Sequence, residues 1–201
     1  MRRLVLMVMV AVMAVGCKAG MLRTDDPAAI TAPAGVGEEN AGLRPRKKPL
    51  AVGAEVPPFM LIDQRGVAVS SGELMATKGA LLVFTPSVEI GSTKAAAVWS
   101  VRNQSVLAQR GVELLLITPN TQDENGMFAA AQGVRVGVLS DPERWVARSF
   151  GATGVMSFVI GRDGRIQLQQ VGLPDSALAA MAADSLPGAK GKSFLDEVLE
   201  R

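Results

Sequence analysis

The sequence of 201 residues contains no histidine, no tyrosine and a single cysteine, Cys17. Without histidine, the chain lacks the side chain that most often acts as a base near neutral pH and most often ligates metals. Serine–histidine–aspartate and cysteine–histidine catalysis are therefore excluded, as are histidine-based zinc sites. A single cysteine also excludes a disulfide within the chain.

A strong charge of one sign is missing as well. The formal net charge is +2, but Arg2 and Arg3 lie in a leader that we expect to be removed. The rest of the chain then keeps 19 of its 21 basic residues against 19 acidic ones. Such a balance gives no reason to expect nucleic-acid binding. We also expect no metal and no cofactor.

The N-terminus has the pattern of an export signal. Residues 4–15 are almost purely apolar, but this run is shorter than the roughly 20 residues that span a bilayer. The following Ala-Val-Gly-Cys at 14–17 resembles the bacterial lipobox, which implies a signal peptide over 1–16 and lipid attachment at Cys17. We therefore expect an envelope protein anchored to the membrane by lipid, its domain facing the periplasm or the exterior. A plain secretory signal and an uncleaved anchor are the alternatives.

Residues 17–50 are rich in alanine, glycine, proline and charges and show no periodicity, which predicts a flexible tether. Within it, residues 44–48 form a basic cluster. We interpret this cluster as part of a solvated tether. The alternative is attraction to anionic lipid headgroups.

Residues 51–201 show strands alternating with helices, then a hairpin and a helix. This order predicts an α/β domain with a thioredoxin-like three-layer α/β/α fold and a central mixed sheet. A helix over 92–109 would begin at an N-cap formed by Ser92 or Thr93 and bury Ala96, Trp99 and either Asn103 or Val106. Strands are expected at 59–63, 80–84, 112–117, 155–160 and 165–170, turns at 64–66 and 162–164, and further helices at 125–132, from Asp141 and Pro142 onward, at 175–185 and at 192–200.

Several motifs occur in a specific order and spacing: VGxxVPPFxL at 52–61, ALLVFxP at 80–86, LSDP at 139–142 and SFVIxxDGxI at 157–166. With them, residues 53–172 resemble the peroxiredoxins, the alkyl hydroperoxide reductase and thiol-specific antioxidant group of the thioredoxin superfamily. The resemblance implies a peroxidatic thiolate in a loop of the type Pro-x-x-x-Thr-Pro-Gly-Cys-Thr that opens a helix. In that family the helix N-terminus and an arginine lower the pKa of the thiol.

The corresponding loop here reads PSVEIGSTK over 86–94. Aligning the family's Gly-Cys-Thr on residues 91–93 places Ser92 at the thiol position, whereas strict spacing from Pro86 places Thr93 there. We prefer Ser92 and leave both open. The family's arginine would fall near Val155 or Met156, where this chain has none, and Met156 stands where thioredoxins have a cis-proline.

A hydroxyl has no sulfenic-acid step, so this route of peroxide reduction is closed to Ser92 and Thr93 alike. We therefore expect a degenerate redoxin domain that acts as a binding or structural module. It would hold an anion, a peptide or an envelope protein partner at backbone N–H groups of Ser92 and Thr93. The alternative is an antioxidant oxidoreductase that uses a non-standard thiol or one from a partner; oligomeric state is left open. The remaining polar candidates are interpreted as solvated charges (Glu89, Lys94) and as turn and cap residues (Asp63, Asp141, Asp163). Met127 and Met156 are interpreted as core or surface residues, with copper ligation as the alternative.

Overall fold

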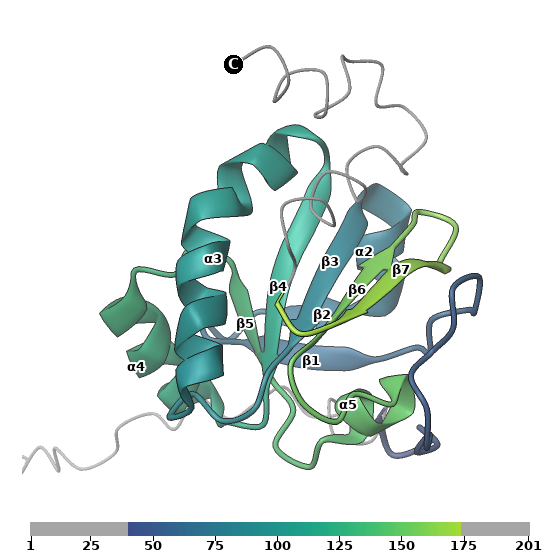
Figure 1. The fold of residues 1–201 in the computed structure, drawn as a ribbon, viewed down its shortest axis with the longest axis horizontal. Coiled ribbons are helices and arrows are strands. Elements are labelled where there is room, and N and C mark those ends of the chain that lie inside the picture. The colour runs from purple at the N-terminus through teal and green to yellow at the C-terminus, as the bar shows by residue number, and fades with distance from the viewer. Residues whose placement is uncertain (1–39, 174–201) are drawn as a thin grey trace, which may run out of the picture.

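The computed structural model describes residues 40–173, which form one mixed sheet with helices on both of its faces (Figure 1). The elements are β1 (Met60–Asp63), β2 (Ala68–Ser70), α2 (Ser71–Thr77), β3 (Gly79–Phe84), α3 (Gly91–Gln109), β4 (Val112–Thr118), α4 (Gln122–Gln132), β5 (Gly137–Ser140), α5 (Trp145–Phe150), β6 (Met156–Ile160) and β7 (Ile166–Val171).

The seven strands lie in the order β2-β1-β5-β4-β3-β6-β7. The three central strands β5, β4 and β3 are parallel, and every other neighbouring pair is antiparallel. Every residue of β3 is buried, as expected for a central strand with both faces covered. The carboxyl ends of β3, β4 and β5 therefore meet at one edge of the sheet, where ligand sites of α/β sheets commonly form.

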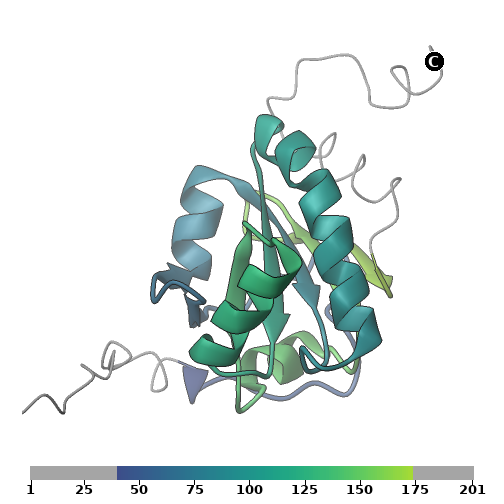
Figure 2. The same ribbon diagram turned by 90° about the vertical axis from the view of Figure 1, so that its left-hand side faces the viewer.

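Helices α3 and α4 lie together on one face of the sheet (Figure 2). The other face is covered by α5, by the chain leading into β1 and, in part, by α2. The core under α5 is largely aromatic, because the rings of Phe84, Phe150 and Phe158 contact one another with centroids 5.1–5.7 Å apart. This arrangement confirms the predicted α/β fold with three layers and a mixed sheet.

Most of the predicted elements are present, with three differences. The sequence analysis did not anticipate β2, α2 or β5. Helix α4 begins at Gln122, earlier than predicted, because Thr121 and Glu124 form a capping box. The predicted helix start at Asp141 and Pro142 is wrong, since Pro142 lies in a turn and α5 begins at Trp145. The helices predicted at 175–185 and 192–200 lie outside the described residues.

The buried stripe of α3 also differs from the prediction. Ala96 is buried as expected, but Trp99 and Asn103 are only half-buried and Val106 is exposed. The buried residues of the helix are instead Thr93, Ala96, Ala97, Ser100 and Leu107. Most of these residues are small, which lets α3 lie close to the sheet. A prediction based on the largest apolar side chains therefore selected the wrong face of α3.

The last part of the predicted tether, residues 40–50, is packed against the domain. The Asn40 side chain donates to the Met60 carbonyl at 2.6 Å and accepts from the Met60 N–H at 3.1 Å. Leu50 is only 2% exposed and its N–H donates to the Phe150 carbonyl at 3.0 Å. For residues 40–50, therefore, the expectation of a flexible tether does not hold.

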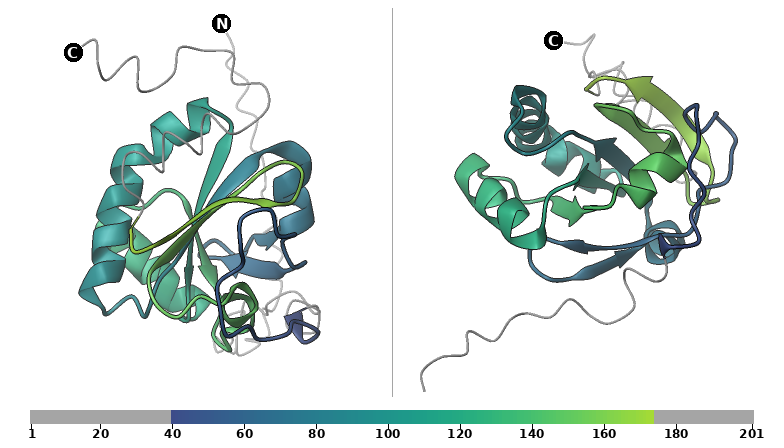
Figure 3. Two further views of the ribbon diagram at one scale, coloured as in Figure 1. Left: turned by 45° about the vertical axis from the view of Figure 1, so that its right-hand side comes forward. Right: turned by 90° about the horizontal axis from the view of Figure 1, so that it is seen from below.

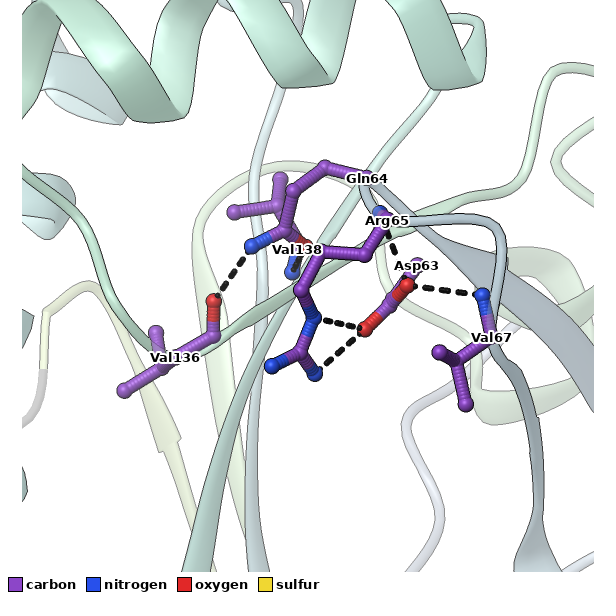
Figure 4. A network of polar contacts seen from close by, with 6 residues as sticks. All are labelled: Asp63, Gln64, Arg65, Val67, Val136 and Val138. Carbon is purple, nitrogen blue, oxygen red and sulfur yellow. Dashed lines mark hydrogen bonds and ion pairs between the residues drawn. The ribbon is translucent and has the colours of Figure 1, made fainter. Parts of the chain in front are cut away.

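The turn after β1 is fixed by side chains (Figure 4). The fully buried Asp63 carboxylate accepts the N–H groups of Arg65 and Val67 at 2.8 and 2.9 Å and the Arg65 guanidinium at 2.5 and 2.8 Å. At the start of β5, the Gln64 side-chain amide donates to the Val136 carbonyl at 2.9 Å and accepts the Val138 N–H at 2.7 Å. These bonds align β1 with the amino end of β5, because the two strands are antiparallel.

Candidate functional site

The loop between β3 and α3 leaves the carboxyl end of the central strand. Thr85 extends the pairing of β3 by one residue, because its N–H donates to the Ile117 carbonyl at 2.9 Å. Pro86 follows and has no N–H to continue the ladder. The loop then turns back on itself, with the N–H of Ile90 donating to the Ser87 carbonyl at 3.0 Å. Glu89 and Ile90 at its tip are exposed, Ile90 by 49%.

Asn120 ties this loop to the next one along the sheet edge. Its side-chain oxygen accepts the buried N–H of Val88 at 2.9 Å, and its amide nitrogen donates to the Glu124 carboxylate at 3.1 Å. The Thr121 N–H and then the Asn120 amide lower the pKa of Glu124 below its usual value, since both bonds favour the charged carboxylate. The loop backbone is thus held from both sides by polar groups in or beside the core.

Helix α3 begins at Gly91 and its N-cap is Ile90, without a side-chain capping bond. The prediction that Ser92 or Thr93 caps the helix is therefore wrong. Ser92 is the second helical residue and is half-buried, whereas Thr93 is fully buried and its hydroxyl donates to the Pro86 carbonyl at 3.0 Å. Thr93 reaches back across the loop and closes it.

The expectation of two free backbone donors at this helix start also needs correction. The N–H of Thr93 donates to the Ile90 carbonyl at 3.0 Å, and the N–H of Lys94 shares that acceptor at 3.3 Å. The Lys94 side chain is exposed. Thr93 therefore cannot offer its N–H to an anion without opening this turn.

Strand β6 lies beside the loop, because Met156 pairs with Phe84 at the end of β3. Met156 is buried in the aromatic core and Val155 is half-buried. No cis peptide bond occurs among residues 40–173, so the position of the thioredoxin cis-proline is occupied by an ordinary trans backbone. Met127, the other methionine considered, is 68% exposed on α4.

The three aspartates predicted as turn and cap residues do have those roles. Asp63 holds the turn shown in Figure 4. Asp141 accepts the N–H groups of Val146 and Ala147 at 3.3 and 2.8 Å, at the start of α5. Asp163 accepts the N–H of Arg165 at 3.1 Å in the hairpin turn. Burial raises the pKa of Asp141, and the backbone N–H groups of α5 oppose that rise.

A separate cavity of about 370 Å³ lies at the same sheet edge. None of its lining residues belongs to the β3–α3 loop. Its walls combine apolar and polar groups: Asn40, Leu61, Ile62, Thr121, Gln122, Ser140, Asp141, Pro142, Glu143 and Trp145. The sequence predicted a binding role for none of these residues. It predicted that Asp141 is a turn or cap residue.

Some expectations lie outside the part of the chain that the structure describes, above all lipid attachment at Cys17. Within residues 40–173, no three histidine, cysteine, aspartate or glutamate side chains gather closely enough to hold a metal ion. No helix of that same part is long and apolar enough to cross a membrane.

Two residues that matter for the loop were missed, although the sequence carried a signal for both. Thr121 and Glu124 form the T-x-x-E pattern of a capping box directly after a predicted strand. A recognised box would have fixed the start of α4 and placed Asn120 at the sheet edge beside the β3–α3 loop. The bond from Val88 to Asn120 itself spans 32 residues and has no local sequence pattern.

Comparison with known proteins gives a consistent result. The AhpC/TSA family profile matches residues 52–169. A candidate peroxiredoxin of Haemophilus influenzae, bcp, is 29% identical over 111 residues, which is 55% of this chain and 71% of that protein. Two solved structures share the fold. Peroxidoxin BcpB from Mycobacterium tuberculosis has a TM-score of 0.57 at 21% identity and covers 67% of this chain and 92% of its own. A candidate thiol:disulfide interchange protein DsbE from Chlorobium tepidum has a TM-score of 0.59 at 24% identity and covers 67% and 98%.

Proposed function

Because the chain belongs to the AhpC/TSA family, we propose that it is an envelope lipoprotein whose redoxin domain lacks peroxidase activity and acts as a binding or structural module. The family membership supports the redoxin-like domain. The loss of peroxidase activity, the lipid anchor and the binding role are inferences from the residues of this chain.

The observation that carries the proposal is the chemistry of the residues at the start of α3. Peroxide reduction in this family needs a thiolate that attacks the peroxide oxygen and becomes a sulfenic acid. At the corresponding place this chain has the hydroxyls of Ser92 and Thr93. A cysteine thiol with a pKa near 8.5 can be tuned to ionise at neutral pH, but a serine or threonine hydroxyl is far less acidic and forms no sulfenic acid.

The loop geometry supports a binding role for the same surface. Val88 is fixed to Asn120 and Thr93 is fixed to Pro86, so hydrogen bonds within the domain hold the loop. At its tip the loop presents Ile90, a large apolar side chain that is half exposed. An ordered loop loses little conformational entropy when a partner binds, and an exposed apolar residue supplies contact area.

Peroxide consumption tests the catalytic half of the proposal. The purified full chain, supplied with a thiol reductant, should consume hydrogen peroxide no faster than the reductant alone. The Cys17→Ser variant removes the sole thiol and is the control for reaction at that residue. A rate well above the reductant background in this variant would contradict the proposal.

Two further variants locate the thiol position. Ser92→Cys and Thr93→Cys each add a thiol at the start of α3, and we expect Ser92→Cys to gain the greater reactivity toward peroxide because Ser92 is half-buried and Thr93 is fully buried. Gain in Thr93→Cys alone would move the alignment by one residue. Peroxidase activity of the native chain that appears only with envelope extract would favour a thiol from a partner.

Membrane fractionation tests the anchor. In a bacterial host the native chain should be found with membranes, and Cys17→Ser should be released from them. A variant that stays bound and unprocessed would identify residues 4–15 as a simple anchor, and lipid attachment at Cys17 would be rejected.

A further inference from the structure

Two segments that are far apart in the sequence bring their basic residues to one surface. Residues 40–50 run along α5, which Figure 3 shows in its left view as the dark blue chain beside the green helix. The N–H of Arg46 donates to the Arg148 carbonyl at 2.9 Å, and Leu50 is joined to Phe150 in the same way. Six exposed side chains lie on residues 40–50 and on residues 141–150, which lead into α5 and form it. We call them the basic surface: Arg44, Arg46, Lys47, Lys48, Arg144 and Arg148.

The basic surface is fixed to the folded domain. Leu50 is buried in the core, and a Cβ placed on Gly151 would lie 2.3 Å from the Lys48 carbonyl oxygen. The backbone hydrogen bonds from Arg46 to Arg148 and from Leu50 to Phe150, together with the buried Leu50 side chain, fix residues 46–50 against α5. The cluster at 44–48 is therefore part of a rigid surface, and its interpretation as a solvated tether does not fit the contacts.

The charge of the domain is concentrated here. Residues 40–173 contain fourteen lysines and arginines and ten aspartates and glutamates. Six of the bases lie on the basic surface, and the acids of the same two segments are Asp141, which is buried, and Glu143. Outside these two segments, the described residues include eight basic and eight acidic side chains, whose formal charges cancel. The net positive charge of the described domain thus comes from one surface.

An aromatic side chain and the direction of the chain give this surface an orientation. Trp145 is half-buried directly after Arg144, and tryptophan beside basic residues is typical of positions at a lipid–water interface. Asn40 lines the same cavity as Trp145 and Glu143, so the chain toward Cys17 enters the domain beside the basic surface.

We propose that the basic surface lies against anionic phospholipid headgroups and holds the domain on the membrane that carries its anchor. The inference rests on the proposed lipid anchor for its geometry, because an anchor at Cys17 would keep this side of the domain near the bilayer. Anionic leaflets attract juxtamembrane basic residues, each of which strengthens membrane association by about fivefold, and salt weakens that attraction.

Fluorescence of Trp145 in the full chain provides the test. Trp99→Phe leaves Trp145 as the sole tryptophan. The chain is reconstituted with vesicles of phosphatidylcholine, or of phosphatidylcholine and phosphatidylglycerol, that contain a lipid with brominated acyl chains. We expect Trp145 to be quenched in vesicles with phosphatidylglycerol, to be much less quenched in phosphatidylcholine alone, and to recover in high salt. Equal quenching in both kinds of vesicle would overturn the proposal.

Charge variants with a matched control make the test specific. Reversal by Arg46→Glu, Lys47→Glu and Lys48→Glu together should lower the ratio of docked to undocked domain by about a hundredfold or more. The control, Arg102→Glu, Arg135→Glu and Arg162→Glu, changes the charge equally at exposed positions away from the basic surface and should change the ratio less than about twofold. Glutamine at positions 46–48 is the second variant, should the reversal disturb folding. An equal effect of both charge reversals would reduce the proposal to general charge attraction.

Flotation of the same vesicles separates this proposal from the anchor. If the native chain floats with phosphatidylcholine vesicles but shows no additional quenching on phosphatidylglycerol, the anchor is supported and the docking is contradicted. If it floats only with vesicles that contain phosphatidylglycerol, the docking is supported and the anchor is contradicted. Flotation with neither contradicts both.

Discussion

The β3–α3 loop and the basic surface are both fixed to the domain by hydrogen bonds, but they present opposite properties to solvent. The loop is held by hydrogen bonds to Asn120 and Pro86, and at its tip it exposes the apolar Ile90 beside a single acidic residue, Glu89. The basic surface is held to α5 by backbone hydrogen bonds, and its charged side chains are exposed. The comparison shows an ordered loop without a cysteine on one surface of the domain, while the net positive charge lies on a different surface.

The attachment of the basic surface depends on the space that Gly151 leaves for residue 48. Gly151→Ala would place a Cβ 2.3 Å from the Lys48 carbonyl oxygen at a φ of +71°. Both the contact and the left-handed backbone are unfavourable for alanine, so we expect the free energy of unfolding to fall by about 3 kcal/mol. Urea denaturation of the full chain measures it.

Gly133→Ala is the matched control for this change. Gly133 also ends a helix, at a φ of +67°, but a Cβ there meets nothing within 4 Å. Its cost should be about 1 kcal/mol, from the backbone conformation alone. Equal losses in the two variants would show that residues 40–50 can move away from α5, and the basic surface would then not be rigid.

Asn120 attaches the β3–α3 loop to the domain, as the packing at Gly151 attaches residues 40–50. Asn120→Ala leaves the buried N–H of Val88 without its acceptor, and an unsatisfied buried donor costs about 2 kcal/mol. Thermal and urea unfolding measure the loss. Asn103→Ala, which removes only a side-chain bond to the Trp99 carbonyl within α3, should cost clearly less. Similar values for both would mean that the loop is not held through Asn120.

The two hydroxyls at the start of α3 should differ in their effect on stability. Thr93→Val removes the bond to Pro86 while keeping the side-chain shape, so we expect a loss of about 1 kcal/mol. Ser92 caps nothing, and Ser92→Ala should change the free energy of unfolding by less than about 0.5 kcal/mol. A loss of about 1 kcal/mol for Ser92→Ala would restore the N-cap that the sequence predicted.

The parts of the fold that could be predicted from the sequence are those with a strong local signal. Residues 80–84 are a continuous apolar run and residues 112–117 are apolar except for Glu113, and both form central strands of the sheet. The short elements β2 and α2 have no such run. Ser70 does cap α2 by accepting the N–H of Glu73, but a cap before seven residues is a weak signal, because short helices depend on tertiary packing.

The candidate site could be predicted only in its chemistry. The missing thiol is visible in residues 86–94 without any structure. The cap at Ile90 is not, because it depends on a turn from Ile90 to Ser87 and on Thr93 reaching back to Pro86. The basic surface is the clearest case, since the backbone contact between Arg46 and Arg148 is what brings its two segments together. No local pattern predicts a contact across about a hundred residues.

Two carboxylates near these regions should respond to pH in opposite directions, which is the smallest of the expected effects. Asp141, at the start of α5, has a pKa raised from 3.8 by burial, so the folded state holds its proton more tightly than the unfolded chain does. Its contribution to stability is complete below pH 3.8 and falls as the pH rises toward the raised value. Glu124, beside the loop, has a pKa lowered from 4.5 by the Thr121 N–H and the Asn120 amide. Its contribution is complete above pH 4.5 and falls as the pH drops toward the lowered value.

Difference curves would show this contrast directly, because each compares a variant with the native chain at the same pH. The free energy of unfolding of the native chain minus that of Asp141→Asn should decrease as the pH rises above 3.8, while the same difference for Glu124→Gln should increase as the pH rises to 4.5. Urea titrations at a series of pH values measure both. Slopes of the same sign would show that burial does not dominate at Asp141, and hence that the capping N–H groups of Val146 and Ala147 stabilise its charge as fully as the capping box stabilises Glu124. The carboxylates of Glu124 and Asp141 would then respond to pH in the same direction. The loop and the basic surface would differ only in their exposed side chains.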